Sequence, residues 1–226
     1  MNSLVDLMIQ HKTVGIKEEG FTLKSGKTSY WYVNCRNLSK TRKVLNDTAK
    51  LVVDYLNNNN LLNNIDYVLG VPEGGTLLGH EVSRLLIEDK SIKDNIYSLR
   101  STPKKHGDPA NKYWTNANVP KSVILLEDVT STGGSVIELA KTLKSMNIEV
   151  KLILSLVDRL QLDPKTNKTV KENMKNEKLD FKSILTAKDF LSKIVNAFDD
   201  NRVIKDKINK EYYQDFKENS PIKLVL

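Results

Sequence analysis

The segment VILLEDVTSTGGS, residues 123–135, constrains the fold of this chain more than any other feature. The four apolar residues 123–126 are typical of a buried parallel strand, and an apolar repeat that begins at Val136 is typical of a helix. Between them lie two acids, Glu127 and Asp128, and a run of small hydroxyl and glycine residues. The segment therefore predicts a strand, a loop and a helix of an α/β protein.

The loop at 130–135 has the composition of an anion site. Backbone N–H groups at the start of a helix converge on one point, and the helix dipole favours negative charge there. Gly133 and Gly134 allow the backbone to approach a phosphate closely. Hydroxyl donors are available from Thr130, Ser131, Thr132 and Ser135. The loop matches neither the P-loop pattern nor the G-x-G-x-x-G pattern of dinucleotide sites.

The two carboxylates before this loop are negatively charged and cannot bind a phosphate. Glu127 and Asp128 suit a polyol such as ribose, or a developing positive charge. A turn that only caps a helix would also contain Ser, Thr and Gly, but it would not need paired acids. We therefore expect this part of the chain to bind a sugar phosphate.

The rest of the chain alternates between strand and helix patterns. Apolar strands are predicted at 67–71, 96–99, 123–126 and 150–157. Helices are predicted at 44–56, at 76–87 and after Gly134. This alternation predicts an α/β fold with a parallel sheet covered on both faces, and ligands on such sheets bind beyond the carboxyl ends of the strands. Alternating aromatic and polar residues at 21–38 predict a hairpin-like hood before the core.

Length and composition exclude several classes of protein. A chain of 226 residues suits one α/β domain, and no apolar run approaches the roughly 20 residues needed to span a bilayer. The N-terminus has no basic region leading into an apolar one, so we expect no secretory signal and a cytoplasmic location. The single cysteine, Cys35, is expected to be a packing residue. The net charge of +7 permits phosphate-rich partners, but lysines alternate with acids, so we expect neither nucleic acid nor membrane as a partner.

The 123–135 segment resembles the PRPP-binding motif of the type I phosphoribosyltransferases, in which an apolar strand and two acids precede a Thr/Ser/Gly loop. PRPP is 5-phosphoribosyl 1-pyrophosphate. The resemblance implies a type I phosphoribosyltransferase fold. It also implies that Glu127 and Asp128 hold the ribose 2′- and 3′-hydroxyls, and that the loop at 130–135 holds the 5′-phosphate.

Further segments resemble the orotate phosphoribosyltransferase family, and the resemblance covers roughly residues 4–196. FTLKSG, from Phe21, is similar to the N-terminal signature, which implies that Lys24 reaches PRPP or the base and that Tyr32 lies near the orotate ring. VDR at 157–159 is similar to a late strand end whose arginine, here Arg159, binds orotate; Ser131 is a further orotate contact by the same resemblance. FKSILTAKDFL at 181–191 resembles the C-terminal strand and helix.

RSTPKKHGD, which begins at Arg100, resembles the catalytic loop of that family, Arg-Lys-x-x-Lys-x-His-Gly. The resemblance implies that the loop reaches the neighbouring subunit's site in a homodimer with shared sites. The implied PRPP contacts in this loop are Arg100, Lys104, Lys105 and His106. The implied catalytic residues of the whole site are Lys104, His106 and Asp128. Mg²⁺ is expected as cofactor, bound mainly through PRPP, with no protein metal ligand assigned.

Two segments depart from the family pattern. The turn that contacts pyrophosphate reads GVPEGG at 70–75, so Glu73 and Gly74 stand where an aromatic residue and a lysine are usual, although both remain candidate PRPP contacts. Ser101 replaces the lysine after the loop arginine. Both changes remove cations, so the charge near pyrophosphate must come from other basic residues of the catalytic loop or from Mg²⁺.

The implied reaction transfers the phosphoribosyl group of PRPP to orotate, giving orotidine 5′-monophosphate and pyrophosphate, a step of pyrimidine (UMP) biosynthesis. One alternative is a regulator with this fold that binds PRPP or a nucleobase; no helix-turn-helix pattern supports it. The other is a purine phosphoribosyltransferase, which Lys24 and Arg159 disfavour. We expect residues 1–196 to form the phosphoribosyltransferase domain with its hood, and residues 197–226 to form a helical extension that docks on the body or on a partner.

Overall fold

The computed structural model describes residues 3–23, 26–106, 112–116, 118–198 and 202–214. Its centre is a parallel sheet in the order β3-β4-β5-β6, formed by Tyr67–Gly70, Ser122–Thr130, Glu149–Asp158 and Phe181–Thr186. The central strands β4 and β5 are almost entirely buried, as expected of strands covered on both faces. The predicted α/β fold with a parallel sheet is confirmed.

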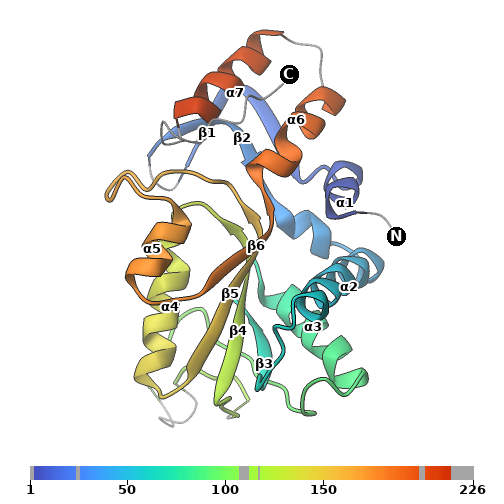
Figure 1. Cartoon of the computed structure of the whole chain (residues 1–226), viewed down its shortest axis with the longest axis vertical. Coiled ribbons are helices and arrows are strands. Elements are labelled where there is room, and N and C mark those ends of the chain that lie inside the picture. Colours follow the sequence, from blue (N-terminus) through green and yellow to red (C-terminus); the bar gives the residue numbers. More distant parts are fainter. Residues whose placement is uncertain (1–2, 24–25, 107–111, 117, 199–201, 215–226) are drawn as a thin grey trace.

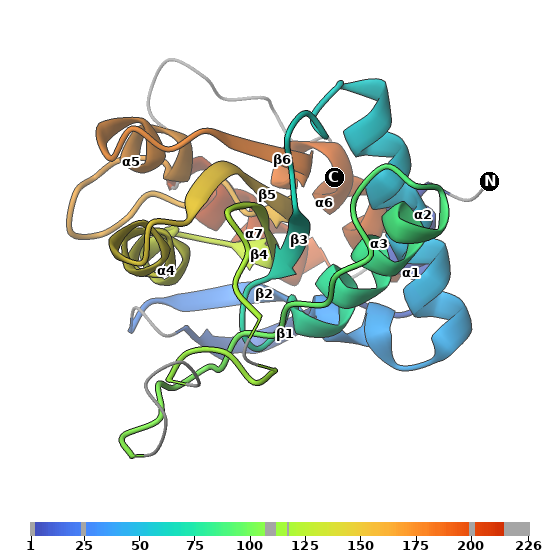
Figure 2. The same ribbon diagram turned by 90° about the horizontal axis from the view of Figure 1, so that it is seen from below.

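Helices cover both faces of this sheet (Figures 1 and 2). One face carries α2 (Arg42–Asn58) and α3 (Thr76–Glu88), and the other carries α4 (Gly134–Ser145) and α5 (Val170–Asn176). Both α2 and α4 bury apolar residues spaced three or four apart, which is the pattern of a helix with one face on a core. Among the described helices, none is both long and apolar enough to cross a membrane.

A smaller layer lies beyond the main sheet. It contains the antiparallel hairpin of β1 (Val14–Thr22) and β2 (Thr28–Val33), followed by the 3₁₀ helix η1 (Cys35–Ser39). The hairpin confirms the predicted hood but begins earlier, at Val14. The helices α1 (Leu4–Gln10), α6 (Ala187–Phe198) and α7 (Arg202–Gln214) pack around it (Figure 1). The predicted boundary at residue 196 falls inside α6, and α7 is the described part of the predicted extension.

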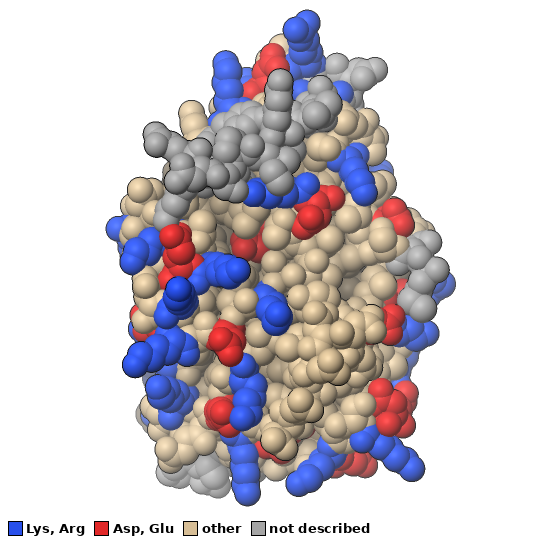
Figure 3. All heavy atoms as spheres, in the orientation of Figure 1, with Lys and Arg blue, Asp and Glu red and all other residues tan. Residues whose placement is uncertain are grey.

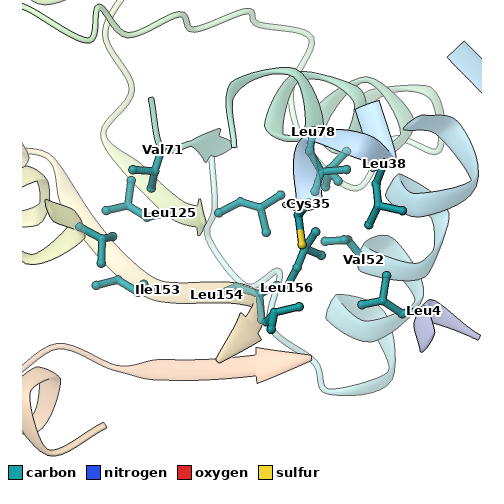
Figure 4. Close-up of a cluster of buried hydrophobic side chains, with 14 of the residues drawn as sticks. Leu4, Cys35, Leu38, Val52, Val71, Leu78, Leu125, Ile153, Leu154 and Leu156 are labelled. Carbon is teal, nitrogen blue, oxygen red and sulfur yellow. The ribbon is translucent and has the colours of Figure 1, made fainter. Parts of the chain in front are cut away.

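The core joins the two layers through η1. Figure 4 shows the Cys35 sulfur amid the side chains of Leu38, Val52 and Leu78. Burial, with a smaller contribution from the nearby charge of Asp128, raises the pKa of the Cys35 thiol well above its usual range. A buried thiol with a raised pKa is a poor nucleophile, so the predicted packing role of Cys35 is confirmed.

One predicted strand is wrong. Residues 96–99 lie outside the four-stranded sheet, and Ile96 is 60% exposed. The segment instead makes an isolated antiparallel bridge between Leu99 and Trp114, and the backbone N–H of Thr115 donates to the carbonyl of Ser98 at 2.9 Å. Because these partners come from the far side of the 101–120 loop, the local apolar pattern did not reveal them.

Candidate active site

A cleft of about 1070 Å³ lies between the carboxyl end of β4 and the β1–β2 hairpin. It is lined by the end of β4, by the loop into α4, by the segment after β5 and by one side of the hairpin. Of the residues predicted for the site, the cleft brings together Tyr32, Glu127, Asp128, Thr130, Ser131, Thr132, Gly133, Gly134, Ser135 and Arg159. These residues thus converge at the carboxyl edge of the sheet.

The start of α4 forms one end of the cleft. Gly133 is the N-cap residue and has φ +78°, a left-handed conformation that favours glycine. No side chain caps this helix end, so the N–H groups of its first turn face the cleft without a side-chain acceptor. Ser131 and Thr132 are half-buried beside them, and Ser135 is exposed. This geometry is that of an anion site at a helix N-terminus.

Thr130 differs from its predicted place in the loop. It is the last residue of β4, and its hydroxyl donates to Ser155 Oγ at 3.0 Å. The backbone N–H of Arg159 also donates to the Thr130 carbonyl at 3.0 Å. The Thr130 hydroxyl is therefore held by β5, while its backbone fixes the start of the loop relative to Arg159.

The two acids have different environments. Glu127 is 8% exposed, whereas Asp128 is half-buried. Burial, reinforced by a hydrogen bond with the Asp128 carboxyl and by its charge, raises the pKa of Glu127 to about 9. Glu127 therefore holds a proton at neutral pH in the ligand-free protein. A neutral donor next to a more accessible carboxyl can serve a polyol, because each hydroxyl both donates and accepts.

The turn at 70–75 packs directly on this acid pair. A Cβ built at Gly74 would lie 2.6 Å from Cγ of Asp128, closer than side-chain atoms approach one another. A Cβ at Gly75 would overlap with the carbonyl oxygen of Leu126. Gly74 thus packs against Asp128, while the side chain of Glu73 is exposed.

Arg159 forms the wall opposite the loop and is only 4% exposed. Its Nη2 donates to Ser29 Oγ at 2.9 Å and to the Trp31 carbonyl at 3.1 Å. Its guanidinium carbon lies 4.1 Å from the centroid of the Trp31 ring, within the range of a cation–π contact. Through these contacts the hairpin fixes the position of Arg159. Burial also raises the pKa of the neighbouring Asp158 to about 6.

Tyr32 lies on the same strand as Trp31 but faces the other way. Its side chain is 43% exposed, and its ring centroid lies 5.7 Å from that of Phe21. An exposed aromatic face at the edge of a cleft can stack on a planar ligand.

The predicted catalytic loop lies apart from this cleft. Lys104, Lys105 and His106 are exposed, and none of them or Arg100 lines the cleft. The backbone N–H of Arg100 donates to the Tyr113 carbonyl, which ties the two sides of the 101–120 loop together. In Figure 2 the described parts of this loop extend past β1 and β2, away from the sheet. Lys24 and Gly107 lie outside the described residues.

The cleft also contains residues that sequence reasoning missed. They are Lys27, Arg36, Gln161, Asp163, Lys165 and Gln214. Gln161 is 5% exposed, and its Nε2 has no hydrogen-bond partner among the described residues. Gln161 could have been predicted from the sequence, because it follows Arg159 by two residues at the end of a strand. Arg36 is exposed on η1. The sequence could not indicate it, because a surface arginine has the same local sequence pattern whether or not it faces a cleft.

Charge on the visible surface is mixed. On the face drawn in Figure 3, basic side chains alternate with acidic ones over the side of the molecule that carries α4 and α5.

Comparisons with known proteins agree with the geometry. Residues 35–190 match the family model described as the phosphoribosyl transferase domain. An orotate phosphoribosyltransferase of Pyrococcus horikoshii is 32% identical over 185 residues, which is 80% of this chain and 87% of the relative.

Solved structures have the same fold. An orotate phosphoribosyltransferase from Francisella tularensis superposes with a TM-score of 0.68 at 18% identity, covering 93% of this chain and 96% of the other. The Mycobacterium tuberculosis orotate phosphoribosyltransferase in complex with PRPP superposes with a TM-score of 0.52 at 18% identity, covering 82% of this chain and 96% of the other.

Proposed function

The chain belongs to the phosphoribosyltransferase family, and from this premise we propose that it is an orotate phosphoribosyltransferase. It transfers the 5-phosphoribosyl group of PRPP to orotate and releases orotidine 5′-monophosphate and pyrophosphate, in pyrimidine biosynthesis. The observation that carries this proposal is the cleft that joins a helix N-terminus, an acid pair and a buried arginine. These three features match a phosphate, a ribose and a carboxylate in turn.

The loop into α4 binds the 5′-phosphate of PRPP. The N–H groups of the first turn and the hydroxyls of Ser131, Thr132 and Ser135 donate to its oxygens, and the helix dipole adds a favourable field. Thr130 contributes indirectly, because its hydroxyl is bonded to Ser155 and its carbonyl accepts from the backbone N–H of Arg159, which fixes the start of the loop.

The acid pair binds the ribose. Departure of pyrophosphate leaves positive charge on the sugar ring, and Asp128 is placed to stabilise that charge. Glu127, protonated in the ligand-free protein, donates to a ribose hydroxyl and holds the ring in place. Both residues act on the same substrate group because their carboxyl groups are hydrogen-bonded to each other.

Arg159 and Tyr32 bind the base. A guanidinium can make a two-point contact with a carboxylate, which orotate has and purine bases lack. Tyr32 stacks on the pyrimidine ring from the hairpin side. By family resemblance, Lys24 completes the contacts to the base.

The described residues contain no group of three or more His, Cys, Asp or Glu that could hold a metal ion. Mg²⁺ would be held mainly by PRPP, with the Asp128 carboxylate of the cleft as a candidate protein ligand, and it would supply charge neutralisation for the pyrophosphate.

The 101–120 loop supplies the remaining cations. Lys104 and Lys105 contact the pyrophosphate, and His106 protonates it as it leaves. Because the described parts of this loop extend away from the cleft of their own chain, we propose that the loop serves the site of the second subunit in a homodimer.

A substrate panel tests the assignment. The protein is incubated with PRPP, Mg²⁺ and either orotate, hypoxanthine or guanine, and loss of each base is followed by absorbance. Consumption of orotate alone is expected. Consumption of a purine base without orotate would reassign the substrate, and binding of PRPP without turnover of any base would indicate a regulator.

A further inference from the structure

Helix α7 lies outside the part of the chain that matches the family model, yet it packs on the hairpin that borders the cleft (Figure 1). Its apolar face is buried: Ile204, Ile208 and Tyr212 are each at most 3% exposed. At its end, Gln214 lines the cleft itself. The helix is thus part of the molecule that surrounds the site.

Two polar contacts fix α7 on the hairpin. Glu211 is 4% exposed, and its Oε2 accepts a hydrogen bond from the backbone N–H of Tyr30 at 2.8 Å. Lys207 donates to the carbonyl of Glu18 at 3.1 Å, and its Nζ lies 5.3 Å from the centroid of the Tyr30 ring. These contacts involve both strands of the hairpin.

The Glu211 contact falls where the hairpin is irregular. The pairing of β1 with β2 is interrupted between Ile16 and Phe21, which leaves Tyr30 between two regular pairs. A backbone N–H at such a position needs another acceptor, and a carboxylate provides a strong one. Glu211 therefore fixes the backbone of β2 at a point where strand pairing does not.

The two neighbours of Tyr30 on β2 hold Arg159. Tyr30 is flanked by Ser29 and Trp31, which accept the two hydrogen bonds from Arg159 Nη2. The Trp31 ring, which also contacts Phe190 of α6, stacks on the guanidinium. The backbone segment fixed by Glu211 is thus the segment that orients Arg159.

We propose that α7 positions the orotate-binding wall of the cleft, with Glu211 as a positioning residue that acts through β2 on Arg159 and Tyr32. This inference rests on the proposed function, because it assigns the base to that wall. Glu211 does not touch the base. Its removal should weaken orotate binding and leave the PRPP end of the cleft unchanged, since the loop into α4 is carried by other elements.

Steady-state kinetics of Glu211→Ala and Glu211→Gln test this. The amide oxygen of glutamine can still accept the Tyr30 N–H, so Gln should retain the contact. We expect the KM for orotate to rise about tenfold in Glu211→Ala, as for loss of a hydrogen bond to a charged group, and to return to within about threefold in Glu211→Gln. The KM for PRPP should change less than about twofold in both.

Two further variants make the test specific. Lys207→Ala removes the second contact from a half-buried side chain and should raise the KM for orotate in the same direction, by a smaller factor. Lys210→Ala, on the exposed face of α7 next to Glu211, is the matched control and should behave as wild type. An equal rise in both KM values in Glu211→Ala would mean general loss of structure and would overturn the proposal.

Hydrogen–deuterium exchange separates this inference from the substrate assignment. Amides of residues 28–33 should exchange faster in Glu211→Ala than in wild type or Glu211→Gln, whatever base the enzyme uses. Unchanged protection of this segment in Glu211→Ala would refute the positioning role. Faster exchange in a protein that does not consume orotate would retain the role of α7 and reject the proposed substrate.

Discussion

Gly74 packs so closely against the Asp128 carboxylate that a methyl group at position 74 would lie 2.6 Å from Cγ of that acid. The turn at 70–75 and the acid pair at the end of β4 are therefore one packed unit. A lysine, which the family pattern places here, would not fit this arrangement without displacing Asp128.

Gly74→Ala should accordingly impair catalysis more than folding. The added methyl group must push the Asp128 carboxylate away from the ribose, and loss of one preorganised electrostatic contact typically costs on the order of a hundredfold in kcat. The melting temperature and kcat are measured on the same preparation. A variant with wild-type kcat would show that the turn at 70–75 can shift to accommodate the methyl group without moving Asp128.

The raised pKa of Glu127 predicts that the stability of the fold depends on pH. Its pKa is raised to about 9 in the folded protein from 4.5, so between these values the folded state keeps a proton that the unfolded state releases. The free energy of unfolding is then greatest below the pKa that Glu127 has in the unfolded chain. It falls as pH rises toward 9, by at most about 1.4 kcal/mol per pH unit from this group.

Glu127→Gln removes that titration. In urea unfolding without ligand, its free energy of unfolding relative to wild type should increase from pH 5.5 to pH 8.5, while its activity falls because the ribose contact is altered. A stability difference that is the same at both pH values would show that Glu127 is not held protonated.

Arg36 should supply part of the positive charge that is missing from the turn at 70–75, where glycine stands in place of the family's lysine. It lines the cleft from η1, which packs against β4, and it follows Cys35, whose thiol is close enough to Asp128 to be affected by its charge. Arg36→Ala should raise the KM for PRPP about tenfold, as for loss of one charge-assisted contact, with little change for orotate. Lys40→Ala, an exposed neighbour outside the cleft, is the control. Equal KM values for PRPP in the two variants would remove Arg36 from the site.

Subunit exchange tests the shared site. Lys104→Ala and Asp128→Asn proteins should each have little activity, but mixing should restore activity, because each mixed dimer has one site with both residues intact. Random pairing makes about half of the dimers mixed, so recovery near a quarter of wild-type activity is expected. Labelled subunits report whether exchange occurs. Exchange without recovered activity would mean that each loop serves its own chain.

The sequence predicted the parts of this molecule that depend on local pattern. The strand and helix around residues 123–135, the parallel sheet and the hairpin follow from burial periodicity and turn residues, and the structure has them. The pattern could not reveal that β4 continues through the acids to Thr130, because the extension depends on pairing with β5. Nor could it reveal that residues 96–99 bond across the 101–120 loop.

Spacing indicated cleft residues that are adjacent in the sequence, and family resemblance indicated Tyr32 and Arg159. Other cleft residues that distant elements contribute were missed. Glu127, Asp128 and the loop into α4 form one segment, so spacing alone indicated them. Arg36 and Gln161 enter the cleft only through packing of η1 and the end of β5. The Glu211 contact joins residues 181 positions apart, and no local signal marks it.

The most direct test of the account measures orotate consumption and orotidine 5′-monophosphate formation by wild type and Asp128→Asn under the same conditions with PRPP and Mg²⁺. The asparagine keeps the size of the side chain and removes its charge, so folding should be retained while kcat falls on the order of a hundredfold. Wild-type turnover of orotate together with that loss is the predicted result. No turnover of orotate by wild type, or near-normal turnover by a folded Asp128→Asn protein, would contradict it.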